Sequence, residues 1–345
     1  MSYLRVSENV QRKTDHIRAA LEEDVEFLTL TPGFERYRFV HQAMPEIDRS
    51  EVDTSVTICG KRLSMPLIIS PMTGGTEEAS LYNRRLAEAA QRFGIAMGVG
   101  SQRVAIEDPS LESTFQVRDV APDVLLFANL GAVQLNNGCG VESCARAVEM
   151  IGADALTLHL NPLQESIQPH GNTNFRELSA RVAEACKGLD VPVFAKEVGH
   201  GISERAAGLL IEAGVDGIDV AGAGGTSWAK VEGLRATDPV TASLSRSLGE
   251  WGIPTVDSLL AVRRAAPRAT VIAGGGVRSG SDIAKAIALG ADAAGIALPL
   301  LRAAADSREA LHAAIAQLRE ELVTAMFCTG CGTIEDLRGV TLVPV

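Results

Sequence analysis

The densest group of residues that could do chemistry is the run HLNPLQE at positions 159–165. It places a histidine, two side-chain amides and a carboxylate at the end of an apolar stretch. His159 alone would more often be a satisfied polar residue than a catalyst. Glu165 has no histidine or aspartate at ligand spacing, yet a single carboxylate beside a diphosphate can hold Mg²⁺, because this ion keeps several waters. The run therefore predicts a site for an anionic ligand and a metal ion.

Lys196 ends a second apolar stretch, VPVFAK, and is followed directly by Glu197. One interpretation is a solvated lysine, or an ion pair with Glu197. The other is a lysine at the open end of a buried strand, where its ammonium group stabilises a bound anion.

Two glycine-rich turns, Gly224-Gly225 and Gly274–Gly276, indicate phosphate binding. Without a Cβ atom, backbone N–H groups can approach phosphate oxygens, and a following helix adds its positive N-terminus. A glycine-rich turn alone can also serve only to reverse the chain. The presence of two such turns, each after an apolar run, favours phosphate.

Eight short apolar runs alternate with amphipathic segments from about residue 65 onward. The runs are 66–70, 95–99, 124–128, 155–160, 191–196, 217–220, 270–273 and 293–297. They are continuously apolar, which is typical of parallel strands covered on both faces. The segments between them include 77–93, 203–213 and 282–289, which have helical periodicity. This order predicts an α/β protein with a (β/α)8 barrel, in which working residues lie at the carboxyl ends of the strands.

Local signals mark the ends of these elements. Thr76, Ser203 and Ser281 are the expected helix N-caps. The tripeptide Gly-Xaa-Asp recurs at 152–154, 214–216 and 290–292, which predicts repeated helix-to-strand turns rather than a site.

Two segments lie outside the repeating pattern. Residues 1–64 form an N-terminal arm and capping segment with no strong helical or strand signal around Arg12 and Lys13. Residues 226–254 are a long excursion after the sixth run, and loops of this length are usually functional or capping. We expect one domain overall, with the barrel at 65–345.

The composition limits the classes of function. The formal net charge is −11, which argues against nucleic acid or an anionic membrane as the main partner. The first 16 residues have no apolar core of a signal peptide, and the six scattered cysteines are typical of a reducing cytoplasm, so we expect a cytoplasmic protein. The pair Cys328 and Cys331 is interpreted as two small residues near the end of a helix.

Several motifs together resemble the type 2 isopentenyl diphosphate isomerase family. They are Arg12-Lys13, MTGG at 72–75, GSQR at 100–103, HLNPLQE at 159–165 and GGTSW at 224–228. The similarity covers about residues 12–335, and HLNPLQE is its most specific part. It implies non-covalent FMN that is active when reduced, NADPH as reductant, Mg²⁺, and interconversion of isopentenyl and dimethylallyl diphosphate in isoprenoid biosynthesis. It also implies a homo-oligomer, either a tetramer or an octamer.

The resemblance assigns roles residue by residue. The FMN-binding residues would be Met72, Thr73, Gly74, Ser101, Asn129, Lys196, Thr226, Gly275, Gly276, Val277, Ala297 and Leu298. The substrate-binding residues would be Arg12, Lys13, Ser101, Gln102, Arg103, Asn161 and Gln164. Glu165 would hold Mg²⁺. Gln164, His159 and Lys196 would be catalytic: Lys196 favours an anionic reduced flavin ring, and Gln164 assists or relays proton transfer.

Two alternatives remain. An FMN-dependent 2-hydroxy acid oxidase of the same fold would carry a His-Gly-Xaa-Arg element after the sixth run. That position reads Gly-Gly-Thr-Ser at 224–227, and the His-Gly pairs at 170–171 and 200–201 lack the arginine. A non-catalytic flavin- or phosphate-binding barrel is the second alternative, against which the polar crowding at 159–165 argues.

Overall fold

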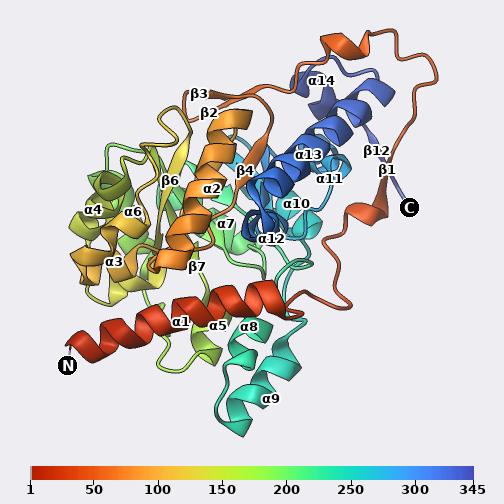
Figure 1. The fold of residues 1–345 in the computed structure, drawn as a ribbon. Helices are drawn as coiled ribbons and strands as arrows, with labels where there is room; N and C mark the ends of the chain where they lie inside the picture. The colour runs from red at the N-terminus through yellow and green to blue at the C-terminus, as the bar shows by residue number, and fades with distance from the viewer. Residues whose placement is uncertain (1) are drawn as a thin grey trace.

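The centre of the molecule is a closed barrel of eight parallel strands in a computed structural model that describes residues 2–345 (Figure 1). The strands are β4 (Leu67–Ile69), β5 (Ala96–Gly98), β6 (Leu126–Gly131), β7 (Ala155–Leu160), β8 (Val193–Glu197), β9 (Gly217–Asp219), β10 (Thr270–Gly274) and β11 (Ala293–Ile296). Neighbours in sequence are neighbours in the barrel, and β11 closes it on β4. The predicted (β/α)8 barrel is confirmed, and each predicted run contains or overlaps one strand.

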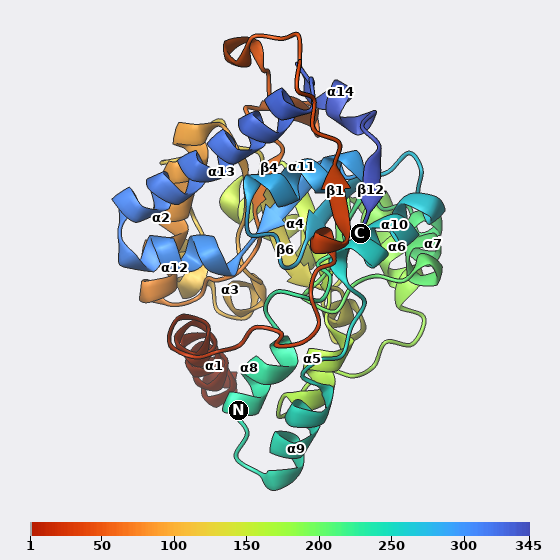
Figure 2. The ribbon, with the colours of Figure 1, turned by 90° about the vertical axis from the view of Figure 1, so that its right-hand side faces the viewer.

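Helices connect the strands, and most of them cover the outside of the barrel (Figures 1 and 2). They are α2 (Glu77–Phe93), α3 (Arg103–Glu107), α4 (Val141–Ile151), α5 (Pro162–Ile167), α6 (Leu178–Gly188), α7 (Glu204–Glu212), α10 (Thr255–Ala265), α11 (Gly280–Ala288) and α12 (Leu298–Asp306). Two further helices, α13 (Arg308–Cys328) and α14 (Ile334–Arg338), lie over α11 and α12. Short 3-10 helices occur at η1 (Phe34–Arg36), η2 (Arg49–Glu51), η3 (Pro109–Thr114) and η4 (Ala132–Asn136).

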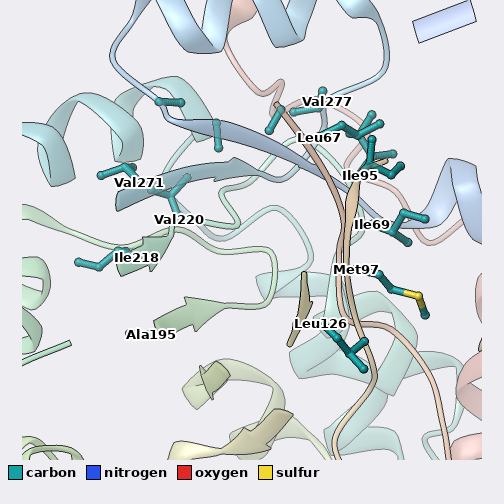
Figure 3. Packing of buried hydrophobic residues seen from close by; sticks show 14 of the residues in the cluster. Leu67, Ile69, Ile95, Met97, Leu126, Ala195, Ile218, Val220, Val271 and Val277 are labelled. Atoms are coloured by element: carbon teal, nitrogen blue, oxygen red, sulfur yellow. The ribbon is translucent and has the colours of Figure 1, made fainter. Parts of the chain in front are cut away.

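The main core lies between the strands and these helices. Strand side chains such as Leu67, Ile69 and Met97 are fully buried there, as Figure 3 shows. Because both faces of a parallel barrel strand are covered, the runs carry apolar residues at consecutive positions.

The helix caps follow the prediction at two of three places. Thr76 and Ser203 accept the expected bonds from the third helical N–H of α2 and α7. The prediction for Ser281 is wrong, because α11 begins two residues earlier. Ser279 is its N-cap, and it forms a reciprocal capping box with Asp282.

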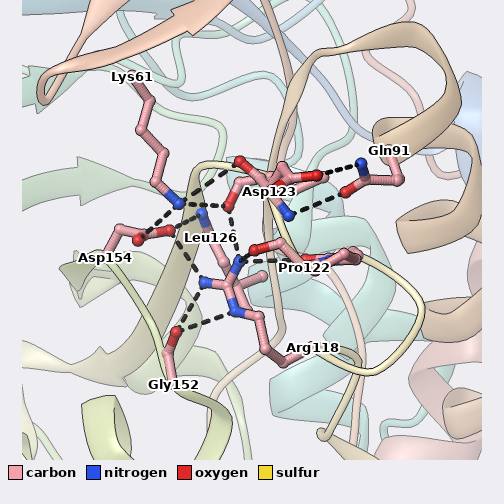
Figure 4. A network of polar contacts seen from close by, with 10 residues as sticks. Lys61, Gln91, Arg118, Pro122, Asp123, Leu126, Gly152 and Asp154 are labelled. Carbon is pink, nitrogen blue, oxygen red and sulfur yellow. Dashed lines mark hydrogen bonds and ion pairs between the residues drawn. The ribbon is translucent and has the colours of Figure 1, made fainter.

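The recurring Gly-Xaa-Asp turns are a structural device at the amino ends of the strands. The Asp154 carboxylate accepts the N–H of Leu126 at 2.9 Å, and Asp216 and Asp292 each accept the N–H at the start of the preceding strand in the same way. Arg118 and Lys61 also bind Asp154, at 2.9 Å and 2.7 Å (Figure 4). The interpretation of these turns as a fold signal is confirmed.

The N-terminal segment caps both ends of the barrel. The hairpin of β2 (Val56–Ile58) and β3 (Lys61–Leu63) inserts Ile58 and Leu63 among buried residues at the amino ends of the strands. At the opposite end lies α1 (Ser2–Glu22), a helix of 21 residues. The expectation of an arm without helical structure is therefore wrong. Outside the barrel, β1 (Tyr37–Phe39) pairs with β12 (Leu342–Pro344) near the C-terminus.

The excursion at 226–254 folds into α8 (Trp228–Leu234), which lies beside α1, and α9 (Pro239–Leu248), which packs on α8 (Figures 1 and 2). Three N–H groups of residues 28–30 donate to Glu250, which holds the arm against this excursion. Within residues 2–345, no helix is long and apolar enough to cross a membrane.

Candidate active site

A cavity of about 230 Å³ lies at the carboxyl ends of the strands, between the barrel and α1. Nearly all residues that the sequence singled out line it. They are Arg12, Lys13, Met72, Thr73, Gly74, Ser101, Arg103, Asn129, His159, Asn161, Gln164, Glu165, Lys196, Thr226, Gly275, Gly276, Ala297 and Leu298. The structure thus brings together residues from the arm, from most strand ends and from the excursion.

Gln102 and Val277 are not among the residues that line this cavity, and their predicted binding roles stay predictions. The Gln102 side chain is fully buried: its Nε2 donates to the Ala147 carbonyl at 2.8 Å, and its Oε1 accepts the N–H of Asn129 at 2.9 Å. The Gln102 side chain therefore fixes the loop beneath Asn129. The Val277 side chain packs in the core (Figure 3).

His159 is held as a neutral ring. Its Nδ1 lies 2.8 Å from the Asn129 Oδ1, so Nδ1 carries the proton and Nε2 keeps its lone pair. Burial, reinforced by the positive charges of Lys196 and Lys13, lowers the pKa of His159 to about 3. A Cβ atom at Gly131 would stand 3.1 Å from the His159 Nε2, so a larger residue there would crowd the ring.

Lys196 pairs with a carboxylate that the sequence did not suggest. Its Nζ lies 3.5 Å from the Asp219 Oδ2 at the end of β9, and it donates to the Glu197 backbone carbonyl at 2.7 Å. The Glu197 carboxylate instead accepts the N–H groups of residues 198–200. Burial raises the pKa of Asp219, and the Lys196 ammonium opposes that rise.

Asn161 organises the residues that follow β7. Its Nδ2 donates to the Gln164 Oε1 at 3.0 Å and to the Glu165 Oε1 at 3.1 Å. Its own Oδ1 is buried and has no protein partner within residues 2–345. A buried acceptor without a partner at a cavity wall is suited to a ligand donor.

The amide of Gln164 is fixed at its other end by a residue of the excursion. Its Nε2 donates to the Glu232 Oε1 at 2.8 Å. Burial alone would raise the pKa of Glu232, but contacts with His16, Gln164 and Arg235 outweigh it and lower the pKa to about 2. This fully buried carboxylate is therefore ionised at neutral pH.

Arg12 and Lys13 face the cavity from α1. Arg12 donates to the Gln168 Oε1 at 3.4 Å, and the Lys13 Nζ donates to the carbonyls of Gly74 and Ser101, both at 2.8 Å. Burial, with a smaller contribution from the Arg12 charge, lowers the pKa of Lys13 to about 7. Both cations are thus placed over the cavity and held by neutral acceptors.

The cavity wall near β10 and β11 fits a phosphate group. Gly275 and Gly276 have left-handed φ values of +100° and +69°. Helix α12 starts at the cavity, and its N-cap residue, Ala297, has no side-chain oxygen to satisfy the first N–H groups. An uncapped helix N-terminus beside glycine-rich backbone is a suitable phosphate site. The glycines also have a packing reason, since a Cβ at Gly276 would lie 2.6 Å from the Gly224 carbonyl.

Glu165 is the candidate metal ligand, and it is well anchored. Its Oε2 accepts the Gln168 Nε2 and the N–H of Asn172, both at 2.5 Å. Among residues 2–345 there is no cluster of three or more potential metal ligands. This arrangement fits an ion such as Mg²⁺ that takes one carboxylate and fills its shell with waters and phosphate oxygens.

Sequence reasoning missed His16, Gln168, Asp219, Glu232 and Arg235. His16 could have been found by placing Arg12, Lys13 and His16 on one helical face. Glu232 lies in the excursion that the sequence did mark as functional or capping. By contrast, the predicted place of the cysteine pair near the end of a helix is confirmed. Cys328 is the last residue of α13, and Cys331 is buried in the core.

Comparison with known proteins agrees with this geometry. The family model for FMN-dependent dehydrogenases matches residues 7–117 and 142–343. An isopentenyl-diphosphate delta-isomerase of Nostoc sp. is 56% identical and covers 95% of this chain and 93% of its own length. One from Synechococcus sp. is 52% identical and covers 95% of this chain and 94% of its own. An isopentenyl-diphosphate delta-isomerase of Rickettsia akari is 48% identical and covers 95% of this chain and 96% of its own length.

Solved structures of similar fold are more distant in sequence. A lactate oxidase of Pediococcus acidilactici has a TM-score of 0.69 at 18% identity, covering 99% of this chain and 94% of its own. A mandelate oxidase has a TM-score of 0.63 at 20% identity, covering 91% and 90%. At these identities the likeness shows the fold alone. The family match supports FMN as the cofactor, and the full-length identities of about half show that the chain belongs to the type 2 isopentenyl-diphosphate delta-isomerases within the FMN-dependent dehydrogenase family.

Proposed function

We propose that the protein interconverts isopentenyl diphosphate and dimethylallyl diphosphate, with reduced FMN as its acid–base cofactor. The observation that carries this proposal is the scarcity of carboxylates among the described residues that line the cavity. Glu165 is the only carboxylate among the described residues that line it, and both of its oxygens accept hydrogen bonds. His159 is neutral, so it is not a strong acid at neutral pH.

The reaction needs one proton added at a carbon and another removed two carbons away. A reduced flavin supplies this capacity, because its ring nitrogens can carry a proton. The residues of the chain then have three tasks: to bind the diphosphate, to orient the reacting carbons and to exclude water.

Each task has named residues. Arg12, Lys13 and Arg103 would bind the diphosphate from one side of the cavity, and Glu165 would hold Mg²⁺ against it. Gly275, Gly276 and the start of α12 would hold the FMN phosphate. Lys196 would favour the anionic form of the reduced ring, and Gln164 would assist proton transfer.

NADPH as the reductant and a tetrameric or octameric assembly belong to the same proposal. Both come from the family resemblance and stay predictions. The finding that Glu165 is the one carboxylate in the described part of the cavity wall, by comparison, comes from the structure of this chain.

The direct test compares turnover by the reduced and the oxidised forms of the FMN-bound protein with isopentenyl diphosphate and Mg²⁺. We expect dimethylallyl diphosphate only from the reduced form. Equal turnover by both forms would contradict the acid–base role of the reduced cofactor.

A further inference from the structure

Glu232 connects two parts of the molecule that have separate tasks. It lies on α8 and its side chain is fully buried. On one side it accepts the hydrogen bond from Gln164, the residue that would assist catalysis. On the other side it contacts α1, the helix that carries the cations for the diphosphate.

The connection passes through a single oxygen atom. The Glu232 Oε1 lies 2.8 Å from the Gln164 Nε2 and 3.0 Å from the His16 Nε2. The N–H of His16 points off the line to this oxygen, so the contact is close but bent. Edge-to-face packing on Trp228, with ring centroids 5.1 Å apart, holds the His16 ring in place.

The second oxygen of the Glu232 carboxylate is also connected to α1, through Arg235. The Glu232 Oε2 lies 2.9 Å from the Arg235 Nη1, and the Arg235 Nε lies 3.4 Å from the Asp15 Oδ2. Helix α1 therefore meets this carboxylate directly through His16 and indirectly through Arg235. Both contacts exist only while α1 is docked over the cavity.

The orientation of the Gln164 amide depends on this carboxylate. The last torsion of a glutamine is broad and roughly two-fold, so the carbonyl and amino ends can exchange places. Asn161 donates to the Gln164 Oε1, and Glu232 accepts from its Nε2. The two partners together select one orientation, and a displaced Glu232 would leave the amide free to rotate.

We propose that His16 is a positioning residue: through Glu232 it fixes the Gln164 amide when α1 docks, so that closing the cavity and orienting Gln164 are one event. This inference rests on the proposed isomerase function and adds a residue to it. Binding energy from the diphosphate, which favours docking of α1, would then also be used to order the residue beside the reacting carbons.

The first test separates kcat from KM. In the FMN-bound, reduced full-length enzyme, His16→Ala should lower kcat about tenfold, because the Glu232 carboxylate loses the close polar contact of 3.0 Å that holds it, with a smaller change in KM. His16→Gln, which can place an Nε2 donor near Glu232, should restore most of the loss. Arg18→Ala is the matched control on α1, because Arg18 is exposed and pairs with Glu22.

The second test does not depend on turnover. Coupling is reciprocal, so removing the Gln164 contact must weaken docking of α1. Gln164→Met should therefore speed hydrogen–deuterium exchange of the backbone at residues 12–22 in the FMN-bound protein without substrate. Gln116→Met is the control, since the Gln116 amide contacts the Met150 carbonyl instead.

A wild-type kcat in His16→Ala, or unchanged exchange in Gln164→Met, overturns the inference. If the wild-type protein fails to isomerise the diphosphate, the proposed function fails. The exchange measurement still decides whether α1 and Gln164 are coupled.

Discussion

The side chains of Gln164 and Glu232 are joined by a hydrogen bond of 2.8 Å between residues 68 positions apart. It links helix α5, which follows β7, to helix α8, which follows β9, across the barrel mouth. A glutamine has no titratable group, so its use in catalysis depends on the direction in which its amide points. The ionised Glu232 carboxylate supplies that direction from a position outside the cavity lining.

Replacing Lys196 should destabilise the protein as well as inactivate it. Lys196→Met leaves the buried Asp219 without its cation, and breaking a buried pair in this way costs about 3–5 kcal/mol. The free energy of unfolding, measured in urea, should fall by an amount of this order. Lys196→Met with Asp219→Asn should recover much of that stability and still lack activity. A single variant as stable as the wild type would show that the pair is not a structural contact.

Lys13 should cause kcat/KM to decrease at alkaline pH. Only the protonated amine can pair with a diphosphate, and burial lowers the pKa of Lys13 to about 7 in the free enzyme. The value of kcat/KM should therefore fall as the pH rises above about 7. The Lys13→Arg variant keeps its charge throughout this range, so its kcat/KM should not decrease in the same way. If kcat/KM of the arginine variant decreases in the same way, a group other than Lys13 causes the decrease.

Glu165 should control the need for Mg²⁺. Glu165→Gln should lower kcat/KM by roughly one to two orders of magnitude, because it removes a charge-assisted contact, and should raise the Mg²⁺ concentration required. FMN should stay bound, since the phosphate wall lies at β10 and β11. Glu184→Gln, on the surface of α6, is the control. If the Mg²⁺ dependence of Glu165→Gln is unchanged, Glu165 is not a ligand of the metal ion.

The arm should be needed for substrate and dispensable for the flavin. Arg12→Ala and Lys13→Ala should each raise KM about 10- to 100-fold, with little change in FMN affinity. Deleting residues 1–20 should abolish turnover and leave a folded, yellow barrel. Measured FMN content and far-UV circular dichroism check the second part. If the truncated protein is as active as the full-length protein, Arg12 and Lys13 do not bind the substrate.

Much of the barrel could be predicted because its elements are encoded locally. Continuous apolar runs mark the strands, and in β7 the predicted and observed bounds agree at both ends. Helix α2 was predicted with both bounds correct for a similar reason: Thr76 and Gly94 mark its two ends. The cap of α11 was misplaced because two serines, at 279 and 281, are close together, and the prediction overlooked that only Ser279 has an acidic residue, Asp282, at the third helical position.

The contacts across the mouth could not be predicted. Helix α1 has few apolar positions, and its docking depends on residues such as Ile17, which packs against Tyr82 and Leu301 far along the chain. Most of the stability of a helix in a protein comes from such tertiary packing rather than from propensity. The pairing of Lys196 with Asp219 likewise arises from strand register, so the adjacent Glu197 was a misleading choice.

The central claim is that the protein is an isomerase with no net redox change. The most direct measurement follows isopentenyl diphosphate by NMR in D₂O, with catalytic FMN-bound protein, Mg²⁺ and a small, known amount of NADPH. We expect many equivalents of deuterated dimethylallyl diphosphate for each NADPH oxidised, and the reverse conversion from the other isomer. Absence of product, or product formed only in proportion to the NADPH oxidised, would contradict it.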